Sequence, residues 1–315
     1  MGLARGVLID VASSPSGIEA ADGSVRIGIH RYGPPPDVDE SRFDVFLTAA
    51  TPPSRLWVGI APPDFDAAVE TLCKRIERQP VAAAIAMQVL RAGEDQSFEQ
   101  ALLLESFAYS ALLGGGAFRS WRALRPTRQR VDATDRVHIA RVNSSIEIRL
   151  ARPAVRNAFD AGMRDELTAA LEFALADPDK APVVLRGEGP AFSAGGDLDA
   201  FGAASDLALA HLVRNAHSPA RLLHQLGERA SVYVHGACIG AGIEIAAGAA
   251  NVVAAPGAFF RLPELDMGLI PGAGGSVTIP RRIGRHRAAW MLLSGADIDV
   301  ETALNWGLVD EVAPA

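Results

Sequence analysis

A glutamate stands among small residues in the stretch HGACIGAGIEIAAGAA, which runs from His235 to Ala250. This residue, Glu244, is the only acidic one in a stretch that is mostly glycine, alanine and isoleucine. Small residues let another group approach the main chain closely, and a helix start leaves backbone N–H groups without internal partners. Such donors suit a developing negative charge. The stretch therefore predicts a carboxylate beside a backbone site for an oxyanion.

A second turn has the same design. The stretch GEGPAFSAGGDLDAF (187–201) follows an expected strand and precedes an expected helix, as the first turn does. If each turn contributes one N–H group, the two together form an oxyanion hole. The alternative interpretation is that both are tight, glycine-rich packing turns.

The stretch FFRLPELDMGLIPGAGGS (259–276) carries a second glutamate, Glu264, in another apolar setting and just after a proline. Either glutamate alone is typical of a helix start or a surface position. Together, and beside two candidate oxyanion turns, they indicate paired acid–base chemistry at a carbon next to a stabilised carbonyl.

Strands and helices alternate around these residues. Two short strands are expected within 137–153, a helix over 161–177, a buried strand over 181–189, and a strand, turn and helix start over 230–242. Repeated strand–turn–helix units favour an α/β fold with largely parallel strands.

The earlier part of the chain divides differently. Strands and loops of unknown role are expected over residues 1–63, and the candidate strands are VRIGIHRYG and FDVFLT. Helices are expected over residues 64–123. The expected helices are Asp64–Gln79, Pro80–Arg91 and Ser97–Leu113, the last with Ser97 and Gln100 at capping-box spacing. A polar linker is expected over 124–135, and a core domain over 136–315.

Composition narrows the class of protein. The 315 residues carry a net charge of −7, which argues against a nucleic-acid binder, and the basic cluster PRRIGRHR (280–287) is interpreted as a solvated helix face. The two cysteines fit a reducing cytoplasm. No apolar stretch reaches the roughly 20 residues of a membrane span, and no HExxH or His/Cys set predicts a metal site.

Residues 136–315 resemble the crotonase, or enoyl-CoA hydratase/isomerase, superfamily. The matching stretches are RPAVRNAF, AFSAGGDL, HGACIGAGIEIA, RLPELDMGLIPGAGG and LSGADIDVETALNWGLVDEV, in the family's order and spacing. The resemblance implies a spiral of ββα repeats, a homotrimer or dimer of trimers, and a place in fatty acid metabolism.

The resemblance also implies a substrate and a site. The substrate is an acyl-CoA or enoyl-CoA thioester, so coenzyme A is part of the substrate and no separate cofactor is expected. Its thioester oxygen is expected between the N–H groups of Ala194 and Ala241, with Glu244 activating water and Glu264 donating the proton. The residues expected near the coenzyme A are Arg156, Ala158, Asp197 and Leu198.

One feature departs from the family. The helical segment 64–123 resembles the helical tail that relatives carry after the core and use for trimerisation, which suggests a circular permutation; an unrelated helical domain is the alternative. Gln88 stands where relatives often have a lysine near the coenzyme A phosphates, and the nearby Arg91 is a candidate substitute. Hydration of an enoyl-CoA is the leading expectation, with enoyl-CoA isomerisation or a non-catalytic acyl-CoA-binding subunit as alternatives.

Overall fold

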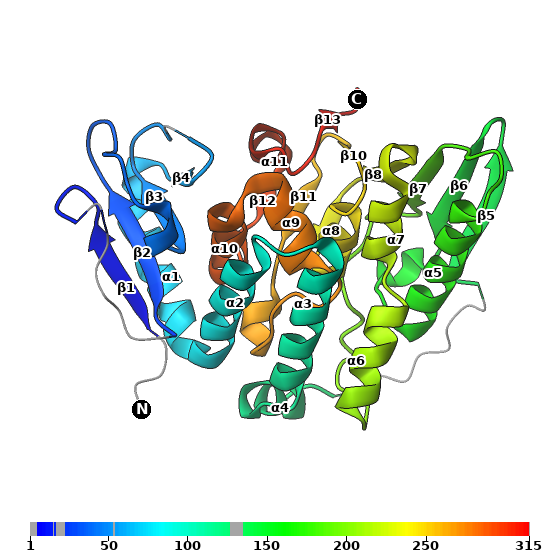
Figure 1. Ribbon diagram of the computed structural model, residues 1–315, viewed down its shortest axis with the longest axis horizontal. Coiled ribbons are helices and arrows are strands. Elements are labelled where there is room, and N and C mark those ends of the chain that lie inside the picture. Colours follow the sequence, from blue (N-terminus) through cyan, green and yellow to red (C-terminus); the bar gives the residue numbers. More distant parts are fainter. Residues whose placement is uncertain (1–4, 15, 17–22, 53, 127–134, 315) are drawn as a thin grey trace.

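The computed structural model describes residues 5–14, 16, 23–52, 54–126 and 135–314, which form three sheets with helices packed on them (Figure 1). The largest sheet has the strand order β13-β10-β8-β7-β6-β5, in which every neighbouring pair is parallel except the antiparallel hairpin of β5 and β6. Its strands are β5 (Val137–Val142), β6 (Ser145–Leu150), β7 (Val183–Gly187), β8 (Ala230–Val234), β10 (Asn251–Ala254) and β13 (Glu311–Val312).

A smaller sheet lies beside it and has the strand order β12-β11-β9. Its strands are β9 (Ala237–Ile239), β11 (Phe259–Arg261) and β12 (Ile298–Asp299). Twice, a strand of the large sheet leads into a strand of the small sheet and then into helical structure: β8, β9 and α8, followed by β10, β11 and η5. The expected α/β fold with largely parallel strands is confirmed.

The helices of this core cover both sheets. They are α5 (Ala161–Leu175), α6 (Leu207–Ala216), α7 (Pro219–Leu226), α8 (Ala241–Ala246), α9 (Gly275–Ile283), α10 (Arg285–Ser294) and α11 (Val300–Trp306). Short 3-10 turns join them at η3 (Pro153–Val155), η4 (Gly227–Arg229) and η5 (Glu264–Met267). The glycine-rich turns that carry the candidate site lie where strands of the two sheets meet these helices.

Four strands between Gly6 and Gly59 build a separate sheet, drawn in blue in Figure 1. All its neighbouring strands are parallel and follow the chain order: β1 (Gly6–Asp10), β2 (Val25–His30), β3 (Val45–Thr48) and β4 (Trp57–Gly59), with η1 (Glu40–Arg42) before β3. The expected strands in VRIGIHRYG and FDVFLT are therefore confirmed. Phe43, Phe46 and Trp57 pack against one another on this sheet with tilted rings and are buried, which gives it an aromatic core of its own.

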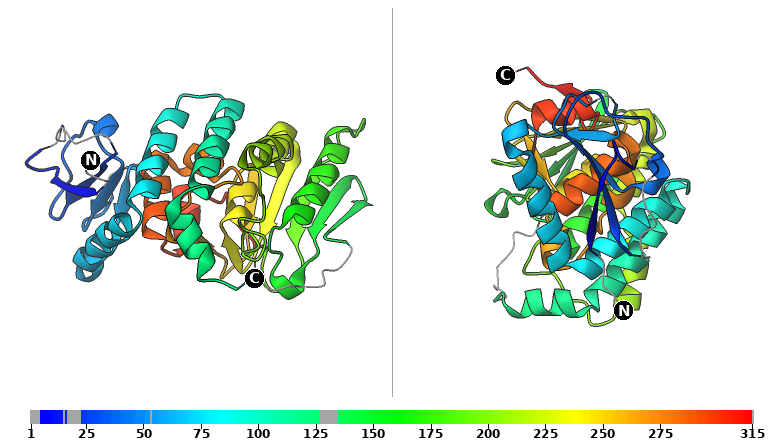
Figure 2. Two further views of the ribbon diagram at one scale, coloured as in Figure 1. Left: turned by 90° about the horizontal axis from the view of Figure 1, so that it is seen from below. Right: turned by 90° about the vertical axis from the view of Figure 1, so that its left-hand side faces the viewer.

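The helical segment packs against the core rather than standing apart (Figure 2). Its helices are α1 (Phe65–Arg78), α2 (Pro80–Gly93), α3 (Phe98–Leu113) and α4 (Gly116–Ala123), with η2 (Pro62–Asp64) before them. The three expected helices are confirmed, as is the capping box of Ser97 and Gln100. Helix α1 contacts α10, α2 contacts α9 and α10, and α3 contacts α6 and α9. The permuted chain order stays a prediction, and most of the expected linker, residues 127–134, lies outside the described residues.

The interpretation of PRRIGRHR as a solvated helix face is wrong for its second half. Arg285, His286 and Arg287 are only 6%, 3% and 7% exposed, because the four-stranded sheet covers this face of α10. The Arg285 guanidinium donates to the carbonyl of Phe43 at 2.9 Å and to the Glu94 carboxylate at 2.9 Å. A helical sequence pattern shows that a face is basic, but not that a distant segment of chain packs on it.

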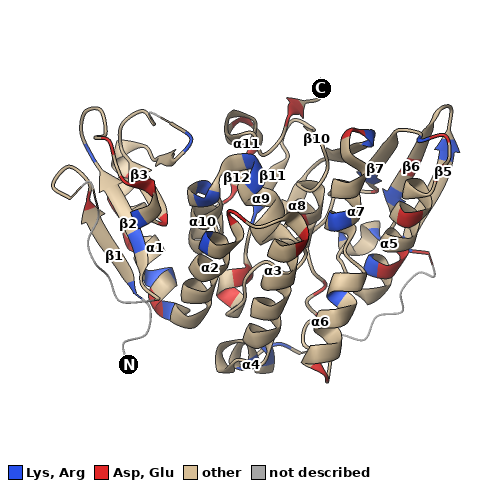
Figure 3. Ribbon diagram, in the orientation of Figure 1, with Lys and Arg blue, Asp and Glu red and all other residues tan. Residues whose placement is uncertain are grey.

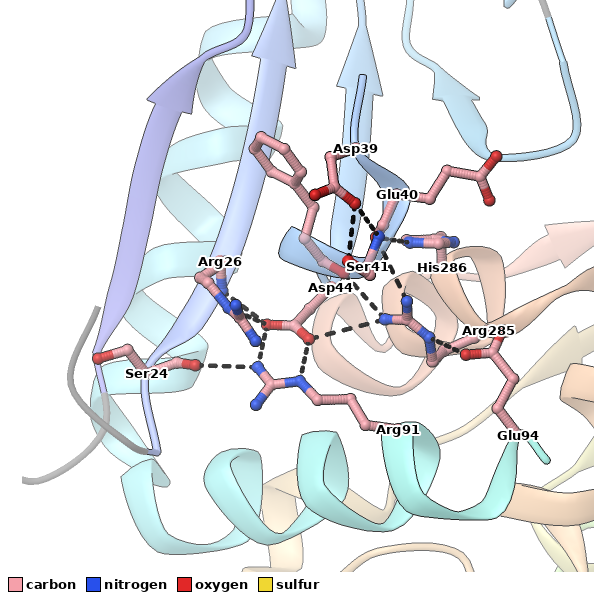
Figure 4. A network of polar contacts seen from close by, with 11 residues as sticks. Ser24, Arg26, Asp39, Glu40, Ser41, Asp44, Arg91, Glu94, Arg285 and His286 are labelled. Atoms are coloured by element: carbon pink, nitrogen blue, oxygen red, sulfur yellow. Dashed lines mark hydrogen bonds and ion pairs between the residues drawn. The ribbon is translucent and has the colours of Figure 1, made fainter. Parts of the chain in front are cut away.

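Asp44 lies at the centre of this contact and is fully buried (Figure 4). Its carboxylate accepts hydrogen bonds from Arg91 at 2.7 and 2.6 Å and from the backbone N–H of Arg26 at 2.8 Å, and Arg285 lies 3.8 Å away. These contacts join β2, β3, α2 and α10, so the network ties the four-stranded sheet to the rest of the molecule. Elsewhere, acidic and basic residues are interspersed along the elements (Figure 3).

Candidate active site

A cavity of about 370 Å³, here called the central cavity, lies where α3 and α6 face the glycine-rich turns of the core. Helix α3 contributes Glu105 and Tyr109 to its lining, and α6 contributes Arg214. Glu244 and Glu264 line it from the core side. The two glutamates that the sequence singled out are therefore brought together at one cavity.

Glu244 is held in the first turn of α8 and is 2% exposed. Its Oε2 accepts hydrogen bonds from the backbone N–H groups of Ala273, at 2.7 Å, and Gly275, at 3.1 Å, at the start of α9. Glycine is needed at 275, because a Cβ there would lie 2.5 Å from Cγ of Glu244. The glycine at position 275 of α9 therefore leaves the space that the Glu244 side chain occupies.

Glu264 begins η5 and is 5% exposed. Among the described residues, no hydrogen-bond partner is found for its buried Oε2. The other oxygen lies over Gly240, where a Cβ would approach it to 2.6 Å, and the φ of +48° at Gly240 also favours glycine. Glu264 therefore presents an unsatisfied carboxyl oxygen beside the turn that carries Glu244.

The pKa values of both carboxyl groups are raised. For Glu244 burial is the main cause and the charge of Glu105 adds to it, while the backbone N–H groups of Ala273 and Gly275 act in the opposite direction. Burial also raises the pKa of Glu264 well above its usual range, and the charge of Glu244 adds to that. Two carboxyl groups so placed favour a state in which one keeps its proton, which is the condition for one acid and one base.

The two glycine-rich turns abut one another. Ser193 and Cys238 form a β-bridge, and a Cβ on Gly195 would lie 2.8 Å from the carbonyl oxygen of Ile239. Ala241 is the first residue of α8 and lines the central cavity. No acceptor for its N–H is found among the described residues, and its role as an oxyanion donor stays a prediction.

Ala194 does not offer the second donor, because its N–H already donates to the carbonyl of Arg156 at 2.8 Å. The N–H groups of Gly195 and Asp197 also have acceptors. Gly196 is different: it lines the central cavity, and its N–H has no acceptor in the described part of the chain. The φ of +90° at Gly195 turns the chain after Ala194, so the N–H that faces the cavity is that of Gly196. The prediction for Ala194 is corrected accordingly.

Comparison with known proteins identifies the family. Residues 141–315, more than half of the chain, match the family model described as enoyl-CoA hydratase/isomerase. The chain belongs to the enoyl-CoA hydratase/isomerase family. It is 39% identical over 168 residues to a Rhodobacter capsulatus protein named "Probable enoyl-CoA hydratase", covering 53% of this chain and 64% of that protein. It is 35% identical over 177 residues to the 2,3-dehydroadipyl-CoA hydratase of Escherichia coli, covering 56% and 69%.

Solved structures of the family agree with this fold. An enoyl-CoA hydratase from Thermoplasma volcanium superposes with a TM-score of 0.52 at 32% identity, covering 56% of this chain and 71% of that one. The crotonase-like α/β fold that the sequence predicted is therefore confirmed for the core. Neither the four-stranded sheet nor α1–α4 lies in the part that matches the family model.

The four residues expected near the coenzyme A are not equally placed. Arg156 is exposed and has a left-handed backbone with a φ of +52°, and Leu198 is 41% exposed. Ala158 is buried, and its carbonyl accepts a hydrogen bond from the Arg152 guanidinium. Asp197 is the one of the four that lines the central cavity, and it pairs with Arg152 at 3.3 Å. Their contact with coenzyme A stays a prediction.

The suggestion that Arg91 replaces the family's lysine does not fit its position. Arg91 is bound to Asp44 and to the carbonyl of Ser24 in the network of Figure 4, and it does not line the central cavity. Gln88 is exposed and does not line the cavity either. Helix α2 packs toward the four-stranded sheet at this point, and Arg91 serves that contact.

Sequence reasoning did not predict that α3 lines the cavity, where it contributes Glu105 and Tyr109 among others. Glu105 is fully buried by the helices and loops around it, and burial raises the pKa of Tyr109, whose ring would meet a Cβ on Gly272 at 2.6 Å. The signal for Glu105 was present: one carboxylate in the otherwise apolar run ALLLESFAYSALL, the same kind of signal that singled out Glu244. It was not used because α3 was assigned to a trimerisation element.

No group of three or more His, Cys, Asp or Glu residues in the described part of the chain could hold a metal ion. In the same residues, no single helix is both long and apolar enough to cross a membrane. Helices α3 and α4 reach that length and composition only as a pair, which is bent by 60°.

Proposed function

We propose that this protein is an enoyl-CoA hydratase, which adds water across the 2,3 double bond of an enoyl-CoA thioester. The observation that carries the proposal is the meeting of Glu244 and Glu264 at one cavity with two unengaged backbone N–H groups, those of Gly196 and Ala241. Membership of the family supplies the thioester class of substrate.

In the proposed mechanism, the thioester oxygen lies between the N–H groups of Gly196 and Ala241. Negative charge builds up on this oxygen as the enolate forms, and the two donors stabilise it. Each such donor commonly contributes roughly 3–4 kcal/mol to the transition state. The donors belong to turns that are fixed by packing, so they need little rearrangement when the charge develops.

The two carboxyl groups then divide the proton transfers. Ionised Glu244 removes a proton from water as the oxygen bonds to C3, and protonated Glu264 gives its proton to C2. The raised pKa of Glu264, caused mainly by burial, supports its role as the acid. The hydrogen bonds from Ala273 and Gly275 favour the charged form of Glu244, which supports its role as the base.

Two other functions use the same cavity. An enoyl-CoA isomerase moves a proton between two carbons and needs only one well-placed carboxylate, whereas a binding subunit needs none. Because both glutamates are buried at the cavity, hydration is the function that uses all of the observed groups.

The test is to incubate the purified protein with crotonyl-CoA and to follow the loss of enoyl absorbance. Glu264→Gln should lower kcat by roughly 10³- to 10⁴-fold and leave binding of the thioester largely intact. Glu99→Gln is the matched control, because Glu99 is exposed on α3. If the enoyl absorbance does not fall and the protein instead moves the double bond of a 3-enoyl-CoA, the protein is an isomerase. If it binds enoyl-CoA thioesters but converts none of them, it is a binding subunit.

We also propose that the protein is a homotrimer or a dimer of trimers. Support comes from large apolar side chains that α3 and its neighbour α6 leave exposed: Leu103, Phe107, Leu209 and Leu212, between 43% and 63%. Light scattering on the purified protein should give the mass of three or six chains, and a monomer mass would contradict the proposal.

A cytoplasmic setting is proposed as well. Cys73 and Cys238 are both free thiols, which suits a reducing compartment. Cell fractionation with an antibody against the protein would test this, and recovery from an oxidising compartment would contradict it.

A further inference from the structure

Glu105 is a buried carboxylate that the hydration mechanism does not use. It is 2% exposed and comes from α3, outside the residues 141–315 that match the family. A buried carboxylate is costly unless its oxygens are satisfied. Those of Glu105 are satisfied entirely by the first turn of α9: by the N–H groups of Gly274 and Ser276, both at 2.8 Å, and by the Ser276 hydroxyl at 2.6 Å.

The same short segment holds Glu244. The N–H groups of Ala273 and Gly275 donate to Glu244, and those of Gly274 and Ser276 donate to Glu105. Four successive N–H groups at the start of α9 thus alternate between two carboxylates that come from different parts of the chain. The helix start that places Glu244 is itself fixed on its other side by Glu105.

We propose that Glu105 is a positioning residue of the candidate active site, which fixes the first turn of α9 behind Glu244 and adds its own negative charge beside the Glu244–Glu264 pair. This inference rests on the proposed function for its activity readout. It assigns no contact with the reacting atoms to Glu105, which acts through Glu244.

The charges around Glu244 support an electrostatic part of this role. Helix α3 presents Glu105 and Tyr109, η5 presents Glu264, and α6 presents Arg214, whose positive charge acts to lower the pKa of Glu105. The charged residues of the other elements that pack on α8 have partners elsewhere: Arg221 of α7 donates to the carbonyl of Ala216, and Arg281 and Arg282 of α9 donate to other backbone carbonyls. His224 of α7 stacks on Phe98, and β9 contributes only the buried thiol of Cys238.

The sign of the effect follows from these charges. Negative charge on Glu105 raises the pKa of Glu244 and also that of Glu264. Removing it should lower both pKa values, because each carboxylate then ionises with less repulsion. Since the hydratase needs Glu244 ionised and Glu264 protonated, its bell-shaped pH–rate profile should move as a whole to lower pH.

The experiment compares Glu105→Gln with wild type and with the matched control Glu99→Gln. The profile of kcat/KM for crotonyl-CoA should move by at least about half a pH unit to lower pH in Glu105→Gln and should stay in place in Glu99→Gln. The kcat at the optimum should also fall, by roughly 10-fold, because the glutamine amide cannot accept from both Gly274 and Ser276. A folded Glu105→Gln protein with the wild-type midpoints overturns the proposal, whatever its kcat.

A second variant covers the case in which Glu105→Gln does not fold. Ser276→Ala removes the hydroxyl that helps Glu105 to keep its charge, so it should move the profile in the same direction by a smaller amount. An unchanged profile in Ser276→Ala then overturns the proposal.

The inference can also be separated from the proposed function. A carboxyl NMR titration of isotope-labelled glutamates in the free protein follows Glu244 and Glu264 without any turnover. If wild type hydrates no enoyl-CoA but both groups titrate at lower pH in Glu105→Gln, the proposed function fails and the positioning role stands. If neither group moves, the positioning role fails.

Discussion

Asp44 and Glu244 are both almost completely buried carboxylates, yet their surroundings differ in kind. Asp44 lies against the side chains of Arg26, Arg91 and Arg285, with ion-pair distances between 2.6 and 3.9 Å. Glu244, like Glu105 and Glu264, has no arginine or lysine within ion-pair distance among the described residues. Oε2 of Glu244 accepts from backbone N–H groups, which lower the pKa of this residue less than burial raises it.

The difference separates a structural carboxylate from one suited to proton transfer. A carboxylate surrounded by guanidinium groups keeps its charge and holds two parts of a protein together, at the risk of a large loss when it is removed. Carboxyl groups satisfied only by neutral donors, and placed near one another, can gain and lose a proton near neutral pH. Burial alone therefore does not distinguish the two kinds of carboxylate; the presence or absence of a direct ion pair does.

The largest effect is expected on stability, from Asp44→Ala. This substitution leaves Arg91 and Arg285, which join the four-stranded sheet to the rest of the molecule, without their common partner. We expect the free energy of unfolding to fall by about 3–5 kcal/mol, as measured by urea denaturation. Turnover per folded molecule should be kept, because Asp44 does not line the central cavity. A loss below about 1 kcal/mol would show that the network adds little to the stability of the joint.

A smaller effect, on activity rather than stability, is expected from Gly275→Ala. The new Cβ would lie 2.5 Å from Cγ of Glu244, so the Glu244 side chain must shift from its place. A displacement of about 1 Å at a reacting group commonly costs roughly 100-fold in rate, and we expect kcat to fall by that factor. Gly116→Ala is the matched control, since a Cβ there meets nothing within 4 Å. Equal kcat values in the two variants would contradict the placement of Glu244.

The smallest effect is expected at an ion pair in water. Glu70 and Lys74 are four residues apart on α1, with side chains 65% and 60% exposed. A double-mutant cycle with alanine should give a coupling energy of about 0.3–0.5 kcal/mol that decreases as salt is added. A coupling energy as large as the stability loss expected from Asp44→Ala would mean that burial makes no difference between the Asp44 network and this exposed ion pair.

Much of this arrangement was readable in the sequence, and the reason is local. The capping box of Ser97 and Gln100 depends on a spacing of three residues, and Glu244 and Glu264 stand out because each is a charge in an apolar run. Features that depend on neighbours along the chain, such as the capping box, can be predicted from the sequence pattern.

What sequence reasoning could not supply depends on contacts between distant segments or on a single backbone angle. The burial of Arg285 requires the four-stranded sheet, more than 200 residues earlier, to pack on α10. The choice between Ala194 and Gly196 as the donor is decided by the φ of Gly195, which composition does not reveal. The role of Glu105 depends on α3 reaching the first turn of α9.

The hydrogen bonds that Glu105 and Glu244 accept from the start of α9 make the candidate site depend on two distant parts of the chain. Glu244 reaches its place only when α9 has begun correctly, and α9 is completed there by a side chain from a helix some 170 residues earlier in the chain. The candidate site therefore has its full set of contacts only in the chain whose early helix and late core segment have docked.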